Sequence, residues 1–485
     1  IPTHGASLPF QARVDFFSPK LPRAGSTQTR GCPLCMPQIL IRAHKNPFTV
    51  ADADTTYRQN LIGNNTGNLV FSQAVYRLLS TANNDLETSG LAKSHPRVIN
   101  SRFDHVVIPL ANAFRPSYIE TLDALSTLIE QLTVPVTVLG VGEQASLNGV
   151  YKGADSVKPA TKRFVRAVLE HSPSIGVRGE RTRDYLNSLG FGDEHVKVIG
   201  CPSMFMYGPD LNVEKKVESL SVDSAIALNV SPYVPQMGPI SLYAAEHFPN
   251  LVYMAQNIQT LELMLYGSYP KGKRMTAVAA KGAPITLEHP LIRSDRVRFF
   301  LDPKTWFDHL AQYDFSFGTR IHGNIAALLA GTPALLLAHD SRTLELAEYH
   351  EIPHRTISSI EDADAIALYA ECDWNRLNKA HPDRWDTFAT FLNDHNLTHI
   401  YNDGEDASAF DERLAATDFP APVRTLMGFS PEELYEMRRT VTDLGRELHV
   451  AYNDLNGASK GRSRKFHHRA WNRIDRAVRS LSMMA

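Results

Sequence analysis

The chain of 485 residues has few cysteines. Four cysteines in a protein of this length are too few for a disulfide framework. Cys32 and Cys35 form a C-P-L-C pair, a spacing that metal and redox sites use. No second pair lies near Cys201 or Cys372, so we expect plain thiols and no structural zinc.

An excess of charge and long apolar runs are lacking as well. Lysine and arginine number 50 against 52 acidic residues, so no overall field attracts nucleic acid or a membrane. No apolar run reaches the roughly 20 residues that a membrane-spanning helix needs. We therefore expect a cytoplasmic protein without a nucleic-acid partner. Because the sequence begins with Ile1, the lack of a targeting segment proves little.

What the sequence does contain is strand patterns that alternate with helical patterns, in two series. The first series runs from Asp104 to Phe205 and the second from Ser224 to Leu337. Strands that alternate with helices of this length predict parallel sheets with crossover helices. We therefore predict an α/β fold of two Rossmann-like domains that face a cleft, where a substrate usually binds.

Changes of composition along the chain set the expected boundaries. The first 50 residues are rich in Pro, Gly, Ser and Arg, and residues 209–222 are charged and lack strand character. From Ser430 an apolar stripe with heptad spacing predicts a helix that packs on the globule or in a short coiled coil. The expected parts are an irregular arm (1–55), an N-terminal Rossmann-like domain (56–208), a linker (209–222), a C-terminal Rossmann-like domain (223–370), a helical extension (371–459) and a basic amphipathic tail (460–485).

The tail differs from the rest of the chain in charge. Eight lysines and arginines accompany a single acid, Asp475, and apolar residues such as Phe466 and Trp471 share one helical face. A basic amphipathic helix of this kind suits peripheral docking on an anionic membrane surface. A solvated helix or a frayed terminus explains the same pattern equally well, so both interpretations stay open.

The stretch from Phe315 to Leu337 completes the second series. A short strand ends at Gly318, Arg320 and His322 lie in the turn, and a helix of small residues follows. In open α/β sheets ligands bind at the carboxyl ends of strands, where the next helix begins. Taken alone, the two side chains are explained equally well by a salt-bridged arginine and a surface histidine.

Four further residues are candidates for substrate binding. Arg178 stands at the strand-to-helix junction of SIGVRGERT, the same topological place as Arg320. Gly67 and Asn68 end a Gly/Asn-rich loop that opens a helix, where free backbone N–H groups suit an anion or a close-packed substrate. Gly67 serves equally well as a turn glycine. Gln256, in the stretch 250–264, completes the set.

These motifs together resemble the polysaccharide pyruvyl transferase family. GTRIHGNIAALLAGTPALLL, preceded by Asp314, is similar to the family's C-terminal signature, in which G-T-R-[hydrophobic]-H opens a helix of small residues. SIGVRGERTRDYL, VIGCPSMF and GNNTGNLVFSQAV resemble three further segments, in the family's order, over about residues 60 to 355. Two features depart from the family: Asn68 stands where many members carry Asp, and IPLANAF replaces a glycine-rich strand end, so acceptor handling is expected to differ.

The resemblance implies a GT-B-like fold and the transfer of a carboxyvinyl unit from phosphoenolpyruvate to a sugar. The product is a pyruvate ketal on two hydroxyls, and phosphate is released. Arg178 and Arg320 would bind the donor, because a planar guanidinium suits both phosphate and carboxylate. His322 would protonate the enol carbon, since histidine titrates near neutral pH, and the backbone amides of Ile321 and His322 would add anion binding. No metal and no cofactor is implied.

Two other functions stay open at this point. A GT-B glycosyltransferase that uses a nucleotide sugar shares the twin-Rossmann plan and would place the same cations on a diphosphate. A non-catalytic glycan- or lipid-binding scaffold would keep the fold and use the basic tail. The acceptor sugar, lipid-linked or free, and a homo-oligomeric state are likewise open. The pairing of Arg320 with His322 favours the pyruvyl interpretation.

Overall fold

A computed structural model describes residues 36–91, 94–145, 154–267 and 273–436, with scattered positions between 439 and 450. The chain divides into two compact units, Ile1–Met36 and Pro37–Ala485, and the described residues apart from Met36 belong to the second unit. Cys32, Cys35 and the predicted basic tail lie outside the described residues, as does much of the heptad-spaced helix after Ser430.

The first sheet is parallel, with strands in the order β2-β1-β3-β5. These strands are Asp85–Ser89, Gln38–Arg42, His105–Pro109 and Val136–Leu139. β7 (Ile175–Val177) pairs with β8 (Val196–Val198), and a parallel bridge to β7 joins the chain just after β5. The accompanying elements are α1 (Ala53–Gln59), α2 (Gly67–Leu79), α3 (Pro96–Arg102), β4 (Asn112–Phe114), α4 (Ile119–Ile129), β6 (Gly142–Glu143), α5 (Ala154–Leu169) and α6 (Glu180–Ser188).

Strand β1 corrects the prediction of an irregular arm that extends to residue 55. It lies inside the sheet, paired with both β2 and β3, and Leu40 and Ile41 are buried. The apolar run Ile39–Ile41 is too short for periodicity to mark it as a strand. Only its pairing with strands that come later in the chain provides its hydrogen bonds and burial, so the sequence around it gave no local signal.

The second sheet is also parallel, with strands in the order β11-β10-β9-β12-β13-β14. These are Val297–Phe299, Leu251–Ala255, Ile226–Asn229, Phe315–Gly318, Ala334–Ala338 and His354–Thr356. The strand order proceeds from β9 to β11 on one side of the sheet and from β12 to β14 on the other. The neighbouring pair β9 and β12 is therefore the switch point, where doubly wound sheets bind ligands. The helices are α7 (Met237–His247), α8 (Ile258–Tyr266), α9 (Lys273–Ala280), α10 (Pro290–Arg293), α11 (Pro303–Leu310), α12 (Ile321–Leu329), α13 (Ser341–His350) and α14 (Ala365–Glu371).

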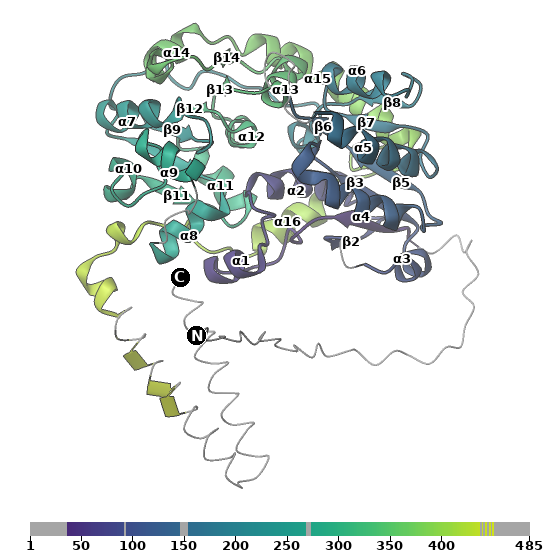
Figure 1. The fold of residues 1–485 in the computed structure, drawn as a ribbon, viewed down its shortest axis with the longest axis horizontal. Coiled ribbons are helices and arrows are strands. Elements are labelled where there is room, and N and C mark those ends of the chain that lie inside the picture. The colour runs from purple at the N-terminus through teal and green to yellow at the C-terminus, as the bar shows by residue number, and fades with distance from the viewer. Residues whose placement is uncertain are drawn as a thin grey trace, which may run out of the picture. The chain divides into compact units, whose positions relative to one another are not determined.

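The helical extension returns to the first domain. It contains α15 (Asn375–Asp394) and α16 (Ser408–Ala416), which Figure 1 shows next to α13 and α2 respectively. Arg77 of α2 forms an ion pair with Asp411 of α16 at 2.6 Å, and the Ile400 N–H donates to the Leu78 carbonyl at 2.9 Å. Because the extension also pairs with β11 through a bridge between Val423 and Phe299, it ties both sheets together.

Direct hydrogen bonds also join the two Rossmann-like domains. The Thr66 N–H donates to the Gln256 carbonyl at 3.0 Å, and Ala145 and Ser341 exchange two hydrogen bonds of 2.8 and 3.1 Å. The prediction of an α/β fold with two Rossmann-like domains in a GT-B-like arrangement is confirmed by this topology. Among the helices of the described ranges, none is both long and apolar enough to cross a bilayer.

Candidate functional site

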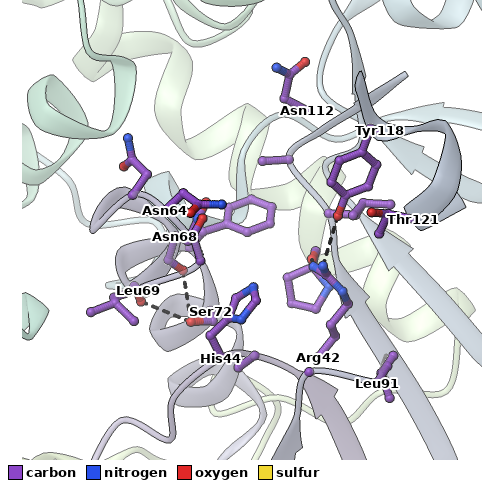
Figure 2. Close-up of a pocket in the computed structure, with 18 of the residues that line it drawn as sticks. Arg42, His44, Asn64, Asn68, Leu69, Ser72, Leu91, Asn112, Tyr118 and Thr121 are labelled. Carbon is purple, nitrogen blue, oxygen red and sulfur yellow. Dashed lines mark hydrogen bonds between the residues drawn. The ribbon is translucent and has the colours of Figure 1, made fainter. Parts of the chain in front are cut away.

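A cavity of about 730 Å³ lies between the two sheets, at the carboxyl ends of several strands. Its lining includes Arg178 from the end of β7, Arg320, Ile321 and His322 from the start of α12, and Arg342 from the start of α13. Figure 2 shows part of the lining from the first domain. The structure therefore brings together the residues predicted from the two strand-to-helix junctions.

Arg178 is a buried side chain held by neutral oxygens. Its Nη2 atom donates to the carbonyls of Ala111 and of Gly140, the latter at 3.3 Å, and its Nε atom has no partner among the described residues. Burial lowers the pKa of Arg178 to about 10. A Cβ atom at Gly142, the first residue of β6, would overlap the Arg178 side chain in this position, so the glycine leaves room for it. The guanidinium stays charged at neutral pH and forms no ion pair with any residue that the structure describes.

Arg320 is the N-cap residue of α12 and is half-buried. Its backbone N–H donates to Asn229 Oδ1 at 2.7 Å, and its side chain donates to the carbonyl of Val230 and to Asn257 Oδ1. Burial lowers its pKa to about 10. No described residue accepts a hydrogen bond from the N–H of Ile321 or His322, so the expected free amides at this helix start are present.

Arg342 is a third arginine of the cavity, which the sequence analysis missed. It follows Asp340, the N-cap of α13, and forms an ion pair with that carboxylate at 3.1 Å. Its place after β13 is equivalent to that of Arg320 after β12. The signal that would have found it is therefore topological: the H-D-S-R turn follows a buried strand in the same manner as the G-T-R-I-H turn.

His322 lies among these arginines. Burial, followed by the charges of Arg178, Arg342 and Arg320, lowers the pKa of His322 to about 3. The expectation that it titrates near neutral pH is wrong for the ligand-free protein, because burial disfavours the imidazolium and the arginines that make the site oppose a further cation. Nε2 of His322 lies 3.8 Å from Cys201 Sγ. Burial raises the pKa of the Cys201 thiol, so the thiol is protonated and can donate to that nitrogen.

The loop before α2 differs from the expectation of free N–H groups. The Gly67 N–H donates to Asn65 Oδ1 at 2.7 Å, and the Asn68 N–H donates to the Asn65 carbonyl at 3.0 Å. The loop therefore satisfies its own donors and offers no anion site there. Gly67 instead allows close packing, since a Cβ atom at this position would lie 2.7 Å from Cβ of His322.

Two predicted binding residues line the cavity with their side chains. Asn68 donates through Nδ2 to the carbonyls of Ile62 and Gly63 at 3.0 and 2.9 Å, which fixes its orientation. Gln256 is 1% exposed, and neither its Nε2 nor its Oε1 atom has a partner among the described residues. A buried amide with unused hydrogen-bonding capacity is costly unless a ligand engages it. The prediction of Gln256 as a binding residue is consistent with this environment.

The cavity continues past these residues into the first domain. Arg42 at the end of β1, Arg115 and Tyr118 line this half, and Figure 2 shows Arg42 directed at the Tyr118 hydroxyl. No Asp, Glu or Lys is present in the described lining. Within the described residues no three His, Cys, Asp or Glu side chains gather as metal ligands would.

The sequence of these segments matches one known family. The profile of the polysaccharide pyruvyl transferase family matches residues 65–341, which is more than half of the chain. The chain belongs to the polysaccharide pyruvyl transferase family. The matched range contains Arg178, Arg320 and His322 and ends one residue before Arg342. No curated protein matches the chain.

Several solved structures are similar to the chain at low identity. A functionally uncharacterised protein from Klebsiella pneumoniae is 13% identical, with 66% of this chain and 94% of that chain covered and a TM-score of 0.35. The Staphylococcus aureus MnaA–UDP co-structure is 12% identical, with 80% and 99% covered and a TM-score of 0.39. The Methanocaldococcus jannaschii UDP-GlcNAc 2-epimerase bound to UDP-GlcNAc and UDP is 11% identical, with 74% and 99% covered and a TM-score of 0.42.

Proposed function

We propose that this protein is a pyruvyl transferase that uses phosphoenolpyruvate as its donor and a sugar with two suitably placed hydroxyls as its acceptor. The observation that carries the proposal is the convergence of Arg178, Arg320 and Arg342, from both domains, around His322. Phosphoenolpyruvate carries a carboxylate and a phosphate, whose charge alone is about −1.5 to −2 at neutral pH. Three guanidinium groups match that donor in charge and in hydrogen-bonding geometry.

The reaction needs a proton on one donor carbon and two new C–O bonds on its neighbour. A proton adds to C3, which becomes a methyl group, and C2 becomes electrophilic. One sugar hydroxyl bonds to C2 and loses its proton, and the C2–O bond to phosphate breaks. The second hydroxyl then bonds to C2 and loses its proton, which closes the ketal. Overall, one of the two hydroxyl protons replaces the proton that C3 takes up, and the other leaves with phosphate.

His322 is the residue that we assign to the proton on C3. In the ligand-free protein it is neutral, because burial and then the three arginines disfavour a positive charge on the ring. Donor binding places negative charge beside those arginines and thereby favours the imidazolium. Arg178, Arg320 and Arg342 hold the donor, the amides of Ile321 and His322 add hydrogen bonds to its anionic oxygens, and Gln256 completes the contacts.

The test is release of phosphate from phosphoenolpyruvate with a panel of simple glycosides. We expect His322→Ala to abolish turnover while donor binding largely survives, and Arg320→Ala or Arg178→Ala to weaken donor binding most. Arg183→Ala is a matched control, since this arginine lies on α6 and pairs with Asp184 at 2.9 Å. Consumption of a nucleotide sugar without consumption of phosphoenolpyruvate would contradict the proposal and favour a glycosyltransferase.

A further inference from the structure

The cavity holds more positive charge than the donor requires. Its described lining includes five arginines and no carboxylate. Arg178, Arg342 and Arg320 are the charges that lower the pKa of His322, whereas Arg42 acts on His44. Their contacts divide them in the same way: Arg178, Arg320 and Arg342 form the donor cluster around His322, whereas Arg42 and Arg115 both contact the Tyr118 side chain and form a second group.

Arg42 has the geometry of a prepared anion-binding residue. Its Nη2 atom donates to the Tyr118 hydroxyl at 3.0 Å and its Nη1 atom to the Pro109 carbonyl at 3.4 Å. Its Nε atom is buried and has no partner among the described residues, and no described carboxylate pairs with this arginine. Neutral acceptors thus hold the guanidinium in place without cancelling its charge. Arg115 packs on the same Tyr118 ring at 5.5 Å.

We propose that the second group binds an anionic substituent of the acceptor, so that the natural acceptor is a sugar that carries a phosphate ester or a carboxylate. The proposal rests on the proposed function, which gives the donor to the cluster around His322. The donor's carboxylate and phosphate use three arginines, and Arg42, which lines the same cavity, stays available. A neutral sugar would leave its buried Nε unpaired, which is unfavourable.

Binding measurements test the proposal independently of turnover. Glucose 1-phosphate, glucuronic acid and methyl glucoside are titrated calorimetrically into the wild-type protein, Arg42→Gln, Arg320→Gln and the control Arg183→Gln. We expect at least one anionic sugar to bind roughly tenfold tighter than methyl glucoside. Arg42→Gln should weaken that sugar about tenfold to a hundredfold and leave phosphoenolpyruvate affinity within about twofold. Arg320→Gln should weaken phosphoenolpyruvate binding and leave the affinity for the anionic sugar largely unchanged.

Comparing the two anionic sugars shows whether a phosphate or a carboxylate is recognised. The sugar whose affinity falls more in Arg42→Gln than in the wild-type protein carries the recognised group. Equal binding of all three sugars, or an anion preference that persists in Arg42→Gln, overturns the proposal. Tyr118→Phe removes only the hydroxyl that orients Arg42 and should weaken the anionic sugar about twofold to fivefold. If Arg42→Gln does not fold, the affinity of Tyr118→Phe for the anionic sugar tests the proposal in its place. Wild-type protein that fails to bind phosphoenolpyruvate contradicts the proposed function, whereas the Arg42 comparison stands by itself.

Discussion

The charge state of His322 in the donor complex is open to direct measurement. Its pKa of about 3 in the ligand-free protein compares with an ordinary value of 6.5. At about 1.36 kcal/mol per pKa unit, burial and the three arginines make protonation roughly 5 kcal/mol less favourable. At neutral pH only about one molecule in ten thousand then carries the imidazolium. In the ligand-free protein His322 is therefore almost entirely the neutral imidazole.

Phosphoenolpyruvate changes this balance, because its negative charge offsets the arginines that oppose His322. The contribution of burial remains, so the pKa of His322 rises without returning fully to its ordinary value. We therefore expect the protein to take up protons when the donor binds. The number taken up per site should increase as the pH falls from about 7.5 to about 6. Acceptor is omitted, so that only binding is observed.

Calorimetric titration in buffers with different heats of ionisation gives the number of protons exchanged. The donor's own phosphate contributes a release, since the arginines favour its fully ionised form. His322→Gln isolates this release, because the amide keeps a similar shape and does not titrate. The informative quantity is the wild-type proton count minus the variant count, which we expect to be positive and at most one per site.

An identical proton count in the two proteins would refute the reasoning. His322 would then stay neutral in the donor complex and the proton on C3 would have to come from elsewhere. A neutral imidazole would still suit the opposite task of accepting a proton from the attacking sugar hydroxyl. The measurement therefore separates an acid from a base role for the same residue, which a loss of activity in His322→Ala does not.

Two further predictions concern residues around the site. Gly67→Ala places a Cβ atom 2.7 Å from Cβ of His322; steady-state kinetics should show turnover falling tenfold or more, with phosphoenolpyruvate affinity within a few-fold. Burial raises the pKa of Glu345 to about 7 from 4.5, where it accepts two hydrogen bonds from Thr182. The stability that its neutral form contributes, about 3 kcal/mol, is present below about pH 4.5 and is lost as the pH rises to about 7. Melting curves of Glu345→Gln should lack this loss, and an unchanged pH dependence would contradict it.

The sequence predicted those parts of the fold whose signal is local. The strand Ile175–Val177 and the turn containing Arg320 were located correctly, because apolar strands followed by helix starts mark strand ends. β1 was missed because its burial depends on strands that lie far away in sequence. Arg342 was missed because the residue types in its turn do not set that turn apart from other loops. Only the parallel pairing of β12 with β13 brings it beside Arg320.

Electrostatic properties were the hardest to predict, because they depend on what gathers around a group. His322 reads as an ordinary histidine until the fold buries it and surrounds it with three arginines from separate segments. The loop before α2 reads as an anion-binding helix start until Asn65 and the Gln256 carbonyl accept its hydrogen bonds. In both cases the residue type was correctly singled out, and the long-range contacts changed what the residue does.

The arginines of this chain differ in what neutralises them, and the difference follows their location. Arg77 pairs with Asp411 at 2.6 Å and Arg163 with Glu130 at 2.8 Å, both away from the cavity. Arg178, Arg320 and Arg42 are instead held by carbonyl, amide or hydroxyl oxygens. Neutral acceptors fix the direction of a guanidinium and leave its full charge for a ligand, whereas a carboxylate would cancel it. Arg342 differs from these three cavity arginines, because it pairs with the carboxylate of Asp340, which also caps α13. It should therefore contribute less to donor affinity than Arg178 or Arg320.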